Sequence, residues 1–206
     1  MQTIHSIALF ANGPIANYDW IKTQIPQFEK IVAVDGGWRH CEKLGLIPDI
    51  VCGDFDSFEP KTHEVQQFYR FPKDKDYSDL EQALKIIYQP TLKNIVCFGA
   101  LGNRTDHTLY NLFLLQRYPL LLKYISEEEK VIAIPKGKHN FSCSKNQCIS
   151  LLPLGNEVKG VTTNHLKWNL RDASMNASFM SLSNICLKED FSIEIKEGIL
   201  LCHFQT

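Results

Sequence analysis

Apolar and polar residues follow two different patterns along the chain. Up to about residue 122, short apolar runs rich in β-branched residues alternate with amphipathic segments. The apolar runs predict strands over 4–10, 31–34, 50–52, 68–71 and 94–98. The amphipathic segments predict helices over 38–44, 60–67, 79–88 and 105–117. Alternating strands and helices favour a mostly parallel sheet, which binds ligands beyond the carboxyl ends of its strands.

The pattern changes after residue 122. Helical spacing fades, and apolar runs predict strands over 130–134, 147–152, 191–195 and 199–204. Turn signals separate these runs at 135–137, 153–155 and 197–198. We therefore predict an α/β protein with a mostly parallel N-terminal α/β domain over 1–122. A smaller all-β domain, like a sandwich or barrel, is predicted over 123–206.

Composition narrows the class of protein. Hydrophobic residues make up 44% and charged residues 22%, as in ordinary globular proteins. A net charge of -1 offers no general attraction to nucleic acid. The apolar runs are too short for a membrane-spanning helix or a signal peptide. The seven cysteines are scattered singly, which indicates buried thiols in a reducing compartment. We expect a soluble cytoplasmic protein without nucleic-acid or membrane partners.

Carboxylates gather at the predicted strand ends. Asp54 and Asp56 follow the run 50–52 two residues apart, so on extended backbone they point the same way. Such a pair suits Mg²⁺, and the alternative is a solvated acidic turn. Asp35 follows 31–34 beside Gly36 and Gly37, which permit close approach of a ligand. The alternative there is a plain strand-to-helix turn.

Two further segments begin helices. Ser78-Asp-Leu-Glu81 is a capping box, so Asp79 opens a helix whose positive end favours an ionised carboxylate. The charged residues 73–79 precede that helix, where free N–H groups stabilise phosphate; the alternative is a solvated loop. In the second segment Arg104, His107 and Asn111 share one predicted helix face, opposite an apolar face formed by Leu109, Leu112 and Phe113.

The second segment also suggests phosphate chemistry. Arg104 offers a bidentate fork for phosphate. His107 fits either the same site or a capping or core position. The chain contains neither a Walker phosphate loop nor a dinucleotide-binding glycine motif after the first strand. A P-loop kinase or a nicotinamide oxidoreductase is therefore not supported.

Taken together, these stretches resemble the thiamine pyrophosphokinase family. The matching stretches, in chain order, are Asp35-Gly-Gly37, Gly53-Asp-Phe-Asp-Ser57, Lys75-Asp-Tyr-Ser-Asp79, Gly99 to Asn111, Leu166-Lys-Trp168 and Ser181-Leu-Ser-Asn184. The resemblance implies two domains and a homodimer whose active sites lie between the subunits. It also implies transfer of a diphosphate group from ATP to thiamine, giving AMP and thiamine diphosphate. The chain departs from the family pattern at Ser78, Asn103 and Asn164-His165.

The resemblance assigns roles residue by residue. It makes Asp54, Asp56 and Asp79 the Mg²⁺ ligands. The surroundings of the ATP phosphates are Asp35, Gly36, Lys75, Asp76, Arg104, Asp106 and His107. The implied thiamine pocket contains Trp168, Ser183 and Asn184. Trp168 can stack on the cationic rings of thiamine or simply belong to the core. Either Asp76 or Asp79 is the candidate that accepts the hydroxyl proton.

Two other functions remain open at this point. The same aspartates suit a metal-dependent nucleotide pyrophosphohydrolase that uses water as the nucleophile. A non-enzymatic sensor of thiamine or its diphosphate is the second alternative. Presence of all three metal aspartates weighs against the sensor, and the matches at 166–168 and 181–184 weigh against the hydrolase.

Overall fold

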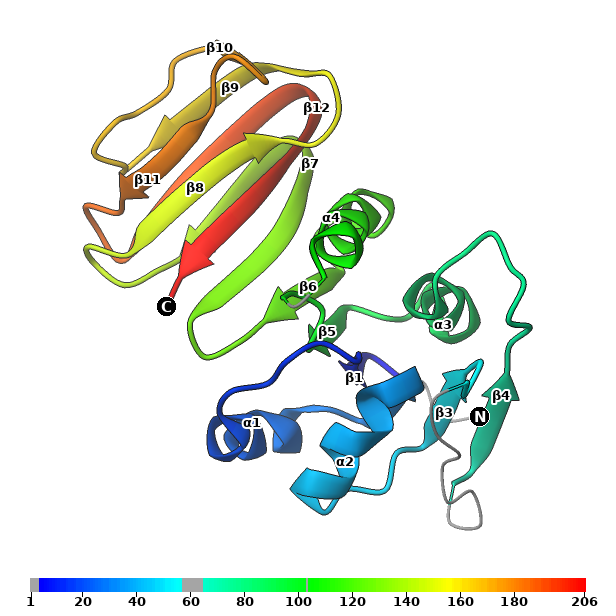
Figure 1. Cartoon of the computed structure of the whole chain (residues 1–206). Coiled ribbons are helices and arrows are strands. Elements are labelled where there is room, and N and C mark those ends of the chain that lie inside the picture. The colour runs from blue at the N-terminus through cyan, green and yellow to red at the C-terminus, as the bar shows by residue number, and fades with distance from the viewer. Residues whose placement is uncertain (1–3, 57–64, 103) are drawn as a thin grey trace. The chain divides into compact units, whose positions relative to one another are not determined.

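A computed structural model describes residues 4–56, 65–102 and 104–206, and the chain divides into two compact units (Figure 1). The first unit contains the residues up to Asn111 together with Tyr124–Glu127. The second unit contains Leu112–Lys123 and Glu128–Thr206. Most of the helix predicted over 60–67 lies outside the described residues, as do Ser57 and Asn103.

The first unit is built on a parallel sheet. Its strands are β1 (Ser6–Phe10), β2 (Lys30–Val34), β3 (Ile50–Gly53), β4 (Gln67–Arg70) and β5 (Asn94–Phe98). They lie in the order β5-β1-β2-β3-β4, and every neighbouring pair is parallel. The five predicted strands are therefore confirmed. Gln67, the last residue of the predicted helix 60–67, belongs instead to β4.

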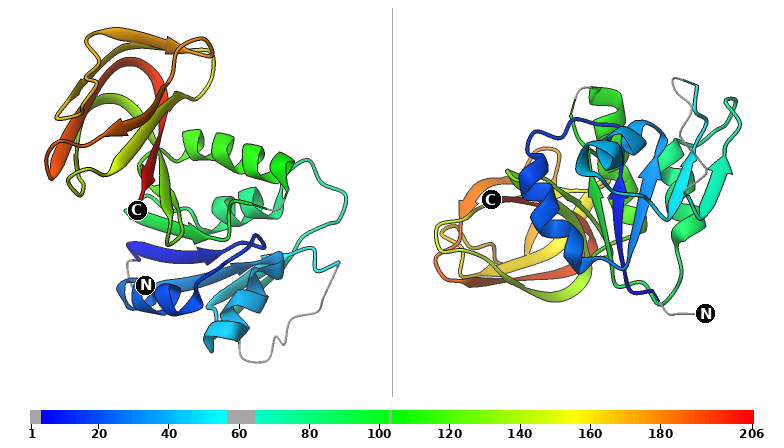
Figure 2. Two further views of the ribbon diagram at one scale, coloured as in Figure 1. Left: turned by 60° about the vertical axis from the view of Figure 1, so that its left-hand side comes forward. Right: turned by 90° about the horizontal axis from the view of Figure 1, so that it is seen from below.

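Helices cover both faces of this sheet. They are α1 (Tyr18–Gln24), α2 (Trp38–Leu44), α3 (Asp79–Ile87) and α4 (Thr105–Leu114). Helices α1 and α2 lie on one face of the sheet and α3 on the other (Figure 2). The sequence did not predict α1, because only Ile21 of its seven residues is buried and no apolar stripe forms. Short 3₁₀ turns occupy Ile25–Gln27, Asp35–Gly37 and Leu115–Arg117.

Helix α3 begins at the predicted capping box. The Ser78 hydroxyl accepts a hydrogen bond from the backbone N–H of Glu81 at 3.2 Å. Leu80, Ala83 and Leu84 are buried against the sheet. The cap and the apolar spacing together fix both the start of the helix and the face that packs inward.

The predicted polar face of α4 is confirmed, because Arg104, His107 and Asn111 line one pocket. The predicted apolar face does not pack inward throughout: Leu109 and Phe113 are each 51% exposed, whereas Asn111 is 8% exposed. The Asn111 side chain donates to the carbonyl of Ala100 at 2.6 Å, and its backbone carbonyl accepts from the Tyr124 hydroxyl at 2.8 Å. A buried amide is tolerated when its hydrogen bonds are made, so the polar face carries a buried residue.

The second unit is a β structure, as predicted. Its strands are β7 (Glu129–Ser142), β8 (Cys148–Pro153), β9 (Glu157–Asn164), β10 (Ala173–Asn176), β11 (Ser181–Ile185) and β12 (Asp190–Gln205), and β6 (Leu122–Ile125) crosses from one unit to the other. Strand β12 pairs with β7 along its length, with β9 in its first half and with β8 in its second. The long strands β7 and β12 therefore form the centre of the β pairing in this unit, and its buried residues form one apolar core.

Two predicted turns in this unit are wrong. The segments 135–137 and 197–198 lie inside β7 and β12, where Pro135 faces Ile199 and Gly137 faces Ile195. The pairing register shifts between these positions, and both Gly137 and Gly198 have positive φ. The glycines thus bend two paired strands together and do not reverse the chain. The turn at 153–155 is confirmed, since β8 ends at Pro153.

Two observations bear on the surroundings of the protein. Among the helices of the described residues, none is long and apolar enough to cross a membrane. All seven cysteines are free thiols, and five of them are buried.

Candidate metal and phosphate site

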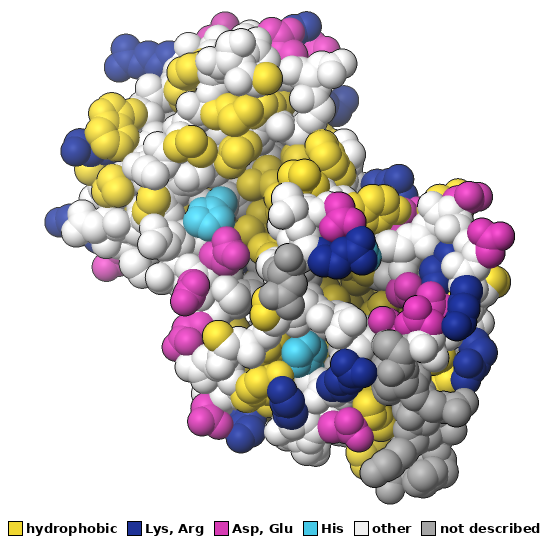
Figure 3. Space-filling model, in the orientation of Figure 1, with side chains coloured by type: hydrophobic (Ala, Val, Ile, Leu, Met, Phe, Trp, Pro, Cys, Tyr) yellow, Lys and Arg dark blue, Asp and Glu magenta, His cyan; other side chains and the backbone are white. Residues whose placement is uncertain are grey.

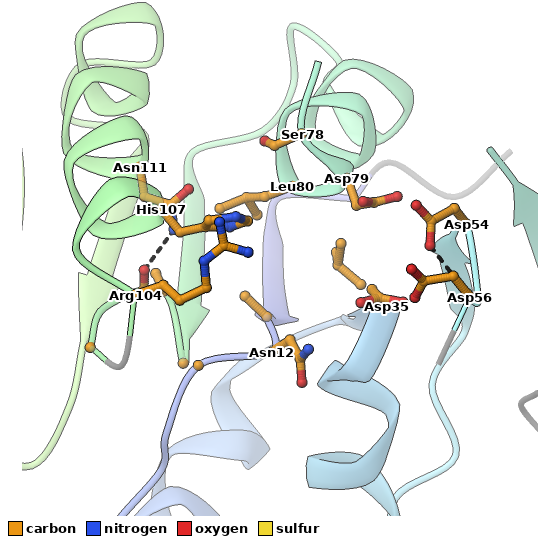
Figure 4. A pocket seen from close by; sticks show the side chains of 16 residues that line it. Asn12, Asp35, Asp54, Asp56, Ser78, Asp79, Leu80, Arg104, His107 and Asn111 are labelled. Atoms are coloured by element: carbon orange, nitrogen blue, oxygen red, sulfur yellow. Dashed lines mark hydrogen bonds between the residues drawn. The ribbon is translucent and has the colours of Figure 1, made fainter. Parts of the chain in front are cut away.

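A cavity of about 550 Å³ lies in the first unit, at the carboxyl ends of its parallel strands (Figure 4). This is the edge at which such sheets bind ligands. Acidic side chains stand on one side of the cavity and Arg104 and His107 on the other. The lining residues are Ala11, Asn12, Gly13, Val34, Asp35, Asp54, Asp56, Ser78, Asp79, Leu80, Gly99, Ala100, Gly102, Arg104, His107 and Asn111.

Three carboxylates form the acidic side. Asp35 follows β2, and Asp54 and Asp56 follow β3; one oxygen of each lies within 4.8 Å of the other two. Phe55 lies between the second pair with φ at 53° and a ring that is only 7% exposed. That ring stacks on Phe68 at 4.8 Å between centroids. The buried ring anchors the turn that presents Asp54 and Asp56.

Asp35 has an unusual environment. Its Oδ1 is buried and has no hydrogen-bond partner among the described residues. Burial raises the pKa of Asp35; a hydrogen bond with the Gly36 backbone lowers it in part, and the neighbouring aspartates raise it further. A buried oxygen without a partner, beside two other carboxylates, fits a bound divalent cation. The sequence had assigned Asp35 to the ATP phosphates, whereas the structure groups it with Asp54 and Asp56.

Lys75 joins two of the aspartates. Its ammonium group lies 2.9 Å from Asp54 and 3.0 Å from Asp79, and its side chain is 11% exposed. Its hydrogen bond lowers the pKa of Asp54. Burial acts to lower the pKa of Lys75, but the bonds to Asp54 and Asp79 outweigh it and raise the pKa. Lys75 therefore stays protonated and fixes both carboxylates at the cavity.

The predicted residues on the opposite side are only partly brought together. Arg104 and His107 line the cavity, as does Asn111. Asp106 is exposed and pairs with Arg104 through two hydrogen bonds, of 3.2 and 2.5 Å. These bonds raise the pKa of Arg104 and lower that of Asp106. Arg104 therefore presents a charged guanidinium that water already reaches.

Other predicted residues lie outside the cavity lining. Asp76 is exposed and does not line the cavity. Gly36 is buried behind the lining, where an added Cβ would come within 1.9 Å of the Asn12 side chain. A side chain at position 36 would therefore have to displace the Asn12 side chain, which lines the cavity. Gly36 therefore shapes the pocket from behind.

The sequence analysis missed the residues that follow β1. Asn12 and Gly13 line the cavity, and Gly13 donates to the carbonyl of Gly99 at 2.8 Å. Asn12 points into the cavity in Figure 4. An Asn-Gly pair directly after a buried strand was the available signal.

In the second unit, two of the predicted thiamine residues are joined. Asn184 is 1% exposed, and its side chain accepts from the backbone N–H of Trp168 and donates to the Trp168 carbonyl, at 3.1 and 2.8 Å. Trp168 itself is 55% exposed, with Lys167 over its ring at 4.6 Å. Trp168 is therefore not a core residue, and Asn184 holds its backbone in place.

Ser183 and His165 take left-handed backbone conformations nearby. Ser183 has φ at 54° and donates its N–H to the Ser150 hydroxyl at 3.0 Å. His165, a departure from the family pattern, lies 3.2 Å from an Asp190 carboxylate oxygen and 3.1 Å from the Lys188 ammonium. The face of this unit seen in Figure 3 also carries many hydrophobic side chains. Among the described residues after 127, the large exposed apolar ones are Trp168, Phe179, Met180, Leu182 and Leu187.

Comparisons with known proteins identify both parts of the chain. Residues 21–126 match the family model "Thiamin pyrophosphokinase, catalytic domain". Residues 129–200 match the family model "Thiamin pyrophosphokinase, vitamin B1 binding domain". The two matches meet between residues 126 and 129, close to the predicted change from α/β to β structure.

Individual relatives agree with the family models. Thiamine pyrophosphokinase 2 of Arabidopsis thaliana is 30% identical over 173 residues, covering 74% of this chain and 64% of that protein. This chain thus spans about 64% of the length of its plant relative. Thiamine pyrophosphokinase of Bacillus subtilis is 25% identical over 180 residues, covering 82% of this chain and 84% of that protein.

The solved structures establish the fold. The crystal structure of thiamine pyrophosphokinase from Bacillus subtilis superposes with a TM-score of 0.83 at 24% identity, covering 98% of this chain and 99% of that one. Thiamin pyrophosphokinase from Candida albicans gives a TM-score of 0.78 at 18% identity, covering 98% and 89%. An α/β catalytic part followed by a β-rich part is therefore the fold of this chain.

Proposed function

The chain belongs to the thiamine pyrophosphokinase family, and from this premise we propose that it transfers a diphosphate group from ATP to the hydroxyl of thiamine. The products are AMP and thiamine diphosphate. The observation that carries the proposal is the buried Asp35 carboxylate oxygen beside Asp54 and Asp56, which has no hydrogen-bond partner in the described part of the chain. It fits a cation site at the end of a cavity large enough for a nucleotide's phosphates.

We propose Mg²⁺ as the metal, held by Asp35, Asp54 and Asp56, with Asp79 beside them. When bound, such an ion neutralises charge on the phosphate oxygens of ATP. Lys75 pairs with both Asp54 and Asp79, at 2.9 and 3.0 Å, and holds the two carboxylates in place. Hard carboxylate oxygens are the donors that Mg²⁺ prefers, so the residues present suit the ion.

On the opposite side, Arg104 and His107 bind the phosphates. The Arg104 guanidinium is preorganised by Asp106 and is exposed, so it can exchange one partner for a phosphate oxygen. Asp106 is thereby a positioning residue for Arg104. Of the two candidates for accepting the thiamine hydroxyl proton, Asp79 is favoured over Asp76 because Asp79 lines the cavity. Gly36 supports the ATP site by packing behind Asn12.

For thiamine we propose a site in residues 123–206, while residues 1–122 handle ATP and the metal. The exposed Trp168 ring stacks on the cationic rings of thiamine, and Asn184 fixes the Trp168 backbone. Ser183 precedes Asn184 and is itself bonded to the Ser150 hydroxyl. We further propose a cytoplasmic homodimer with sites shared between subunits. The free cysteines and the exposed apolar residues of the β unit support this proposal.

The proposal is tested by incubating the purified protein with ATP, Mg²⁺ and thiamine and following AMP and thiamine diphosphate together. Controls omit thiamine or the metal. Equal, thiamine-dependent formation of both products is expected. AMP formed without thiamine diphosphate would establish a pyrophosphohydrolase in place of the transferase. If neither product forms but the protein binds thiamine, the protein is a sensor. The comparisons support neither the pyrophosphohydrolase nor the sensor. Light scattering that shows a monomer at all concentrations would refute the homodimer.

A further inference from the structure

Helix α3 carries a carboxylate that is completely buried. Glu81 is 0% exposed, although burying a charged group is costly unless it is paired and hydrogen-bonded. Lys85 and Tyr110 are two donors that reach it among the described residues. Lys85 lies one turn later on the same helix, with its ammonium 2.8 Å from Oε1. The Tyr110 hydroxyl donates to Oε2 from the neighbouring helix α4.

These two helices form opposite sides of the cavity. Asp79 and Leu80 lie in the first turn of α3, which Ser78 caps; His107 and Asn111 lie on α4, and Arg104 directly precedes that helix (Figure 4). Glu81 lies two residues after Asp79, and Tyr110 lies three residues after His107. Neither Glu81 nor Tyr110 lines the cavity itself. Their hydrogen bond therefore joins the helices behind the residues that face the ligand.

We propose that the Glu81–Tyr110 hydrogen bond is a brace that sets the separation of α3 from α4. It holds Asp79 on one side of the cavity against Arg104 and His107 on the other. This inference rests on the proposed function, because it assigns Glu81 and Tyr110 as positioning residues of the same ATP site. It also explains why a charged residue occupies a fully buried position in α3, where an apolar side chain would pack without a desolvation cost.

The brace acts on geometry and not on folding alone. Helix α4 is held separately by the Asn111 side chain on the Ala100 carbonyl and by the Tyr124 hydroxyl on the Asn111 carbonyl. Removing the Tyr110 hydroxyl therefore leaves α4 attached but free to shift. A misplacement of about 1 Å lowers a rate by up to about 100-fold when catalysis depends on positioning.

Two substitutions, one at each donor to Glu81, test the brace against each other. Tyr110→Phe and Lys85→Met each remove one donor to the same carboxylate, but only Tyr110 connects the two helices. Lys85→Met also loses a contact of the ammonium with the Tyr77 ring, at 3.2 Å. Methionine keeps the length of the stem and a polarisable sulfur near that ring. Thermal unfolding of both variants reports how much each destabilises the protein.

We expect Tyr110→Phe to raise the KM for ATP by about 3- to 10-fold, while the KM for thiamine stays within about twofold. The expected change in the KM for ATP is smaller than the roughly 100-fold effect that a misplacement of about 1 Å can have. Lys85→Met is expected to lower the melting temperature but to leave the KM for ATP within about twofold. An unchanged KM for ATP in Tyr110→Phe would overturn the brace. An equal rise in both variants would also overturn it, because destabilisation alone would then explain the effect.

The brace and the proposed function can fail separately. If the wild-type protein makes no thiamine diphosphate, the same two variants are compared by the Kd of a non-hydrolysable ATP analogue with Mg²⁺, measured by calorimetry. A raised Kd in Tyr110→Phe alone supports the brace without the proposed activity. Equal Kd values for the wild type and Tyr110→Phe refute it.

Discussion

Replacing Asp35 by asparagine is expected to change the stability of the metal-free protein and its affinity for the metal in opposite directions. Asparagine has nearly the same shape and keeps an oxygen that can accept the Gly36 hydrogen bond, but it carries no charge. In the absence of metal, the Asp35 charge faces Asp54 and Asp56 with oxygens at most 4.8 Å apart. The substitution therefore removes repulsion from the metal-free protein and removes a ligand from the proposed metal site.

The size of the effect follows from that spacing. Two unit charges 4.8 Å apart repel by about 1 kcal/mol in water and about 3.5 kcal/mol at the effective dielectric constant near a protein surface. Lys75 offsets part of this at Asp54, with its ammonium 2.9 Å away. We expect Asp35→Asn to stabilise the metal-free protein by about 1–2 kcal/mol. For a chain of this size the melting temperature rises by roughly 2–8 °C.

The assay measures melting with and without Mg²⁺, alongside thiamine diphosphate formation. Mg²⁺ is expected to stabilise the wild type but not the variant, since a ligand stabilises only a state that binds it. The activity of Asp35→Asn should fall by at least about 100-fold. This loss exceeds that expected from replacing a residue that only hydrogen-bonds to a metal ligand. Asp19→Asn is the control, because it removes the same charge from a side chain that is 91% exposed. A variant that melts lower than wild type without metal, or gains equally from Mg²⁺, would refute the reasoning.

Two other predictions concern different parts of the chain. Trp168→Ala should raise the KM for thiamine by about 10-fold, because about 1.4 kcal/mol of stacking energy is lost. The KM for ATP should stay nearly unchanged, and equal changes in both KM values would exclude stacking. Burial lowers the pKa of His40 below its usual 6.5, partly opposed by its bond to the Gly13 carbonyl. As the pH falls, His40 is therefore protonated in the unfolded chain before it is protonated in the folded protein. The contribution of His40 to the free energy of unfolding has its full value above pH 6.5 and decreases below it. Urea midpoints between pH 8 and 5 should show this decline in the wild type and a weaker one in His40→Gln; parallel curves would contradict the assignment.

Local signals predicted the parallel sheet well. Strands buried on both faces have continuous apolar sequences, and β1, β2, β3 and β5 have interiors of this kind. The cap at Ser78 predicted where α3 begins. Both signals depend on residues that are close in sequence, so no knowledge of the tertiary structure was required.

Errors arose where a distant partner decides the outcome. Asn111 is buried because the Ala100 carbonyl accepts from it, and nothing in the helix itself indicates that bond. Gly198 bends β12 because β7 bends with it at Gly137. A glycine that bends a paired strand and one that reverses the chain look the same in sequence, since the difference lies in the strand opposite.

The site residues, too, were predictable from the sequence only where the signal is local. The spacing of Asp54 and Asp56 places both carboxylates at one point, and the structure agrees. Asp35 joins them because Gly53 leaves room for its backbone: an added Cβ there would lie 3.0 Å from the Asp35 Cα. Asp76 belongs to the matching stretch 75–79, yet it is exposed and does not line the cavity. Order along the chain does not reveal which residues of such a stretch reach the cavity.

Backbone strain is present at the carboxylate site, as it is at five other described non-glycine residues with positive φ. Asp35 and Phe55 are both non-glycine residues with positive φ, at 48° and 53°, and they follow neighbouring strands β2 and β3. Each such conformation costs about 1–2 kcal/mol relative to ordinary backbone. The fold therefore tolerates both strain and carboxylate repulsion at one edge of the sheet. A bound cation removes the repulsion but not the strain, so the strain is the cost of placing the carboxylates in advance of the metal.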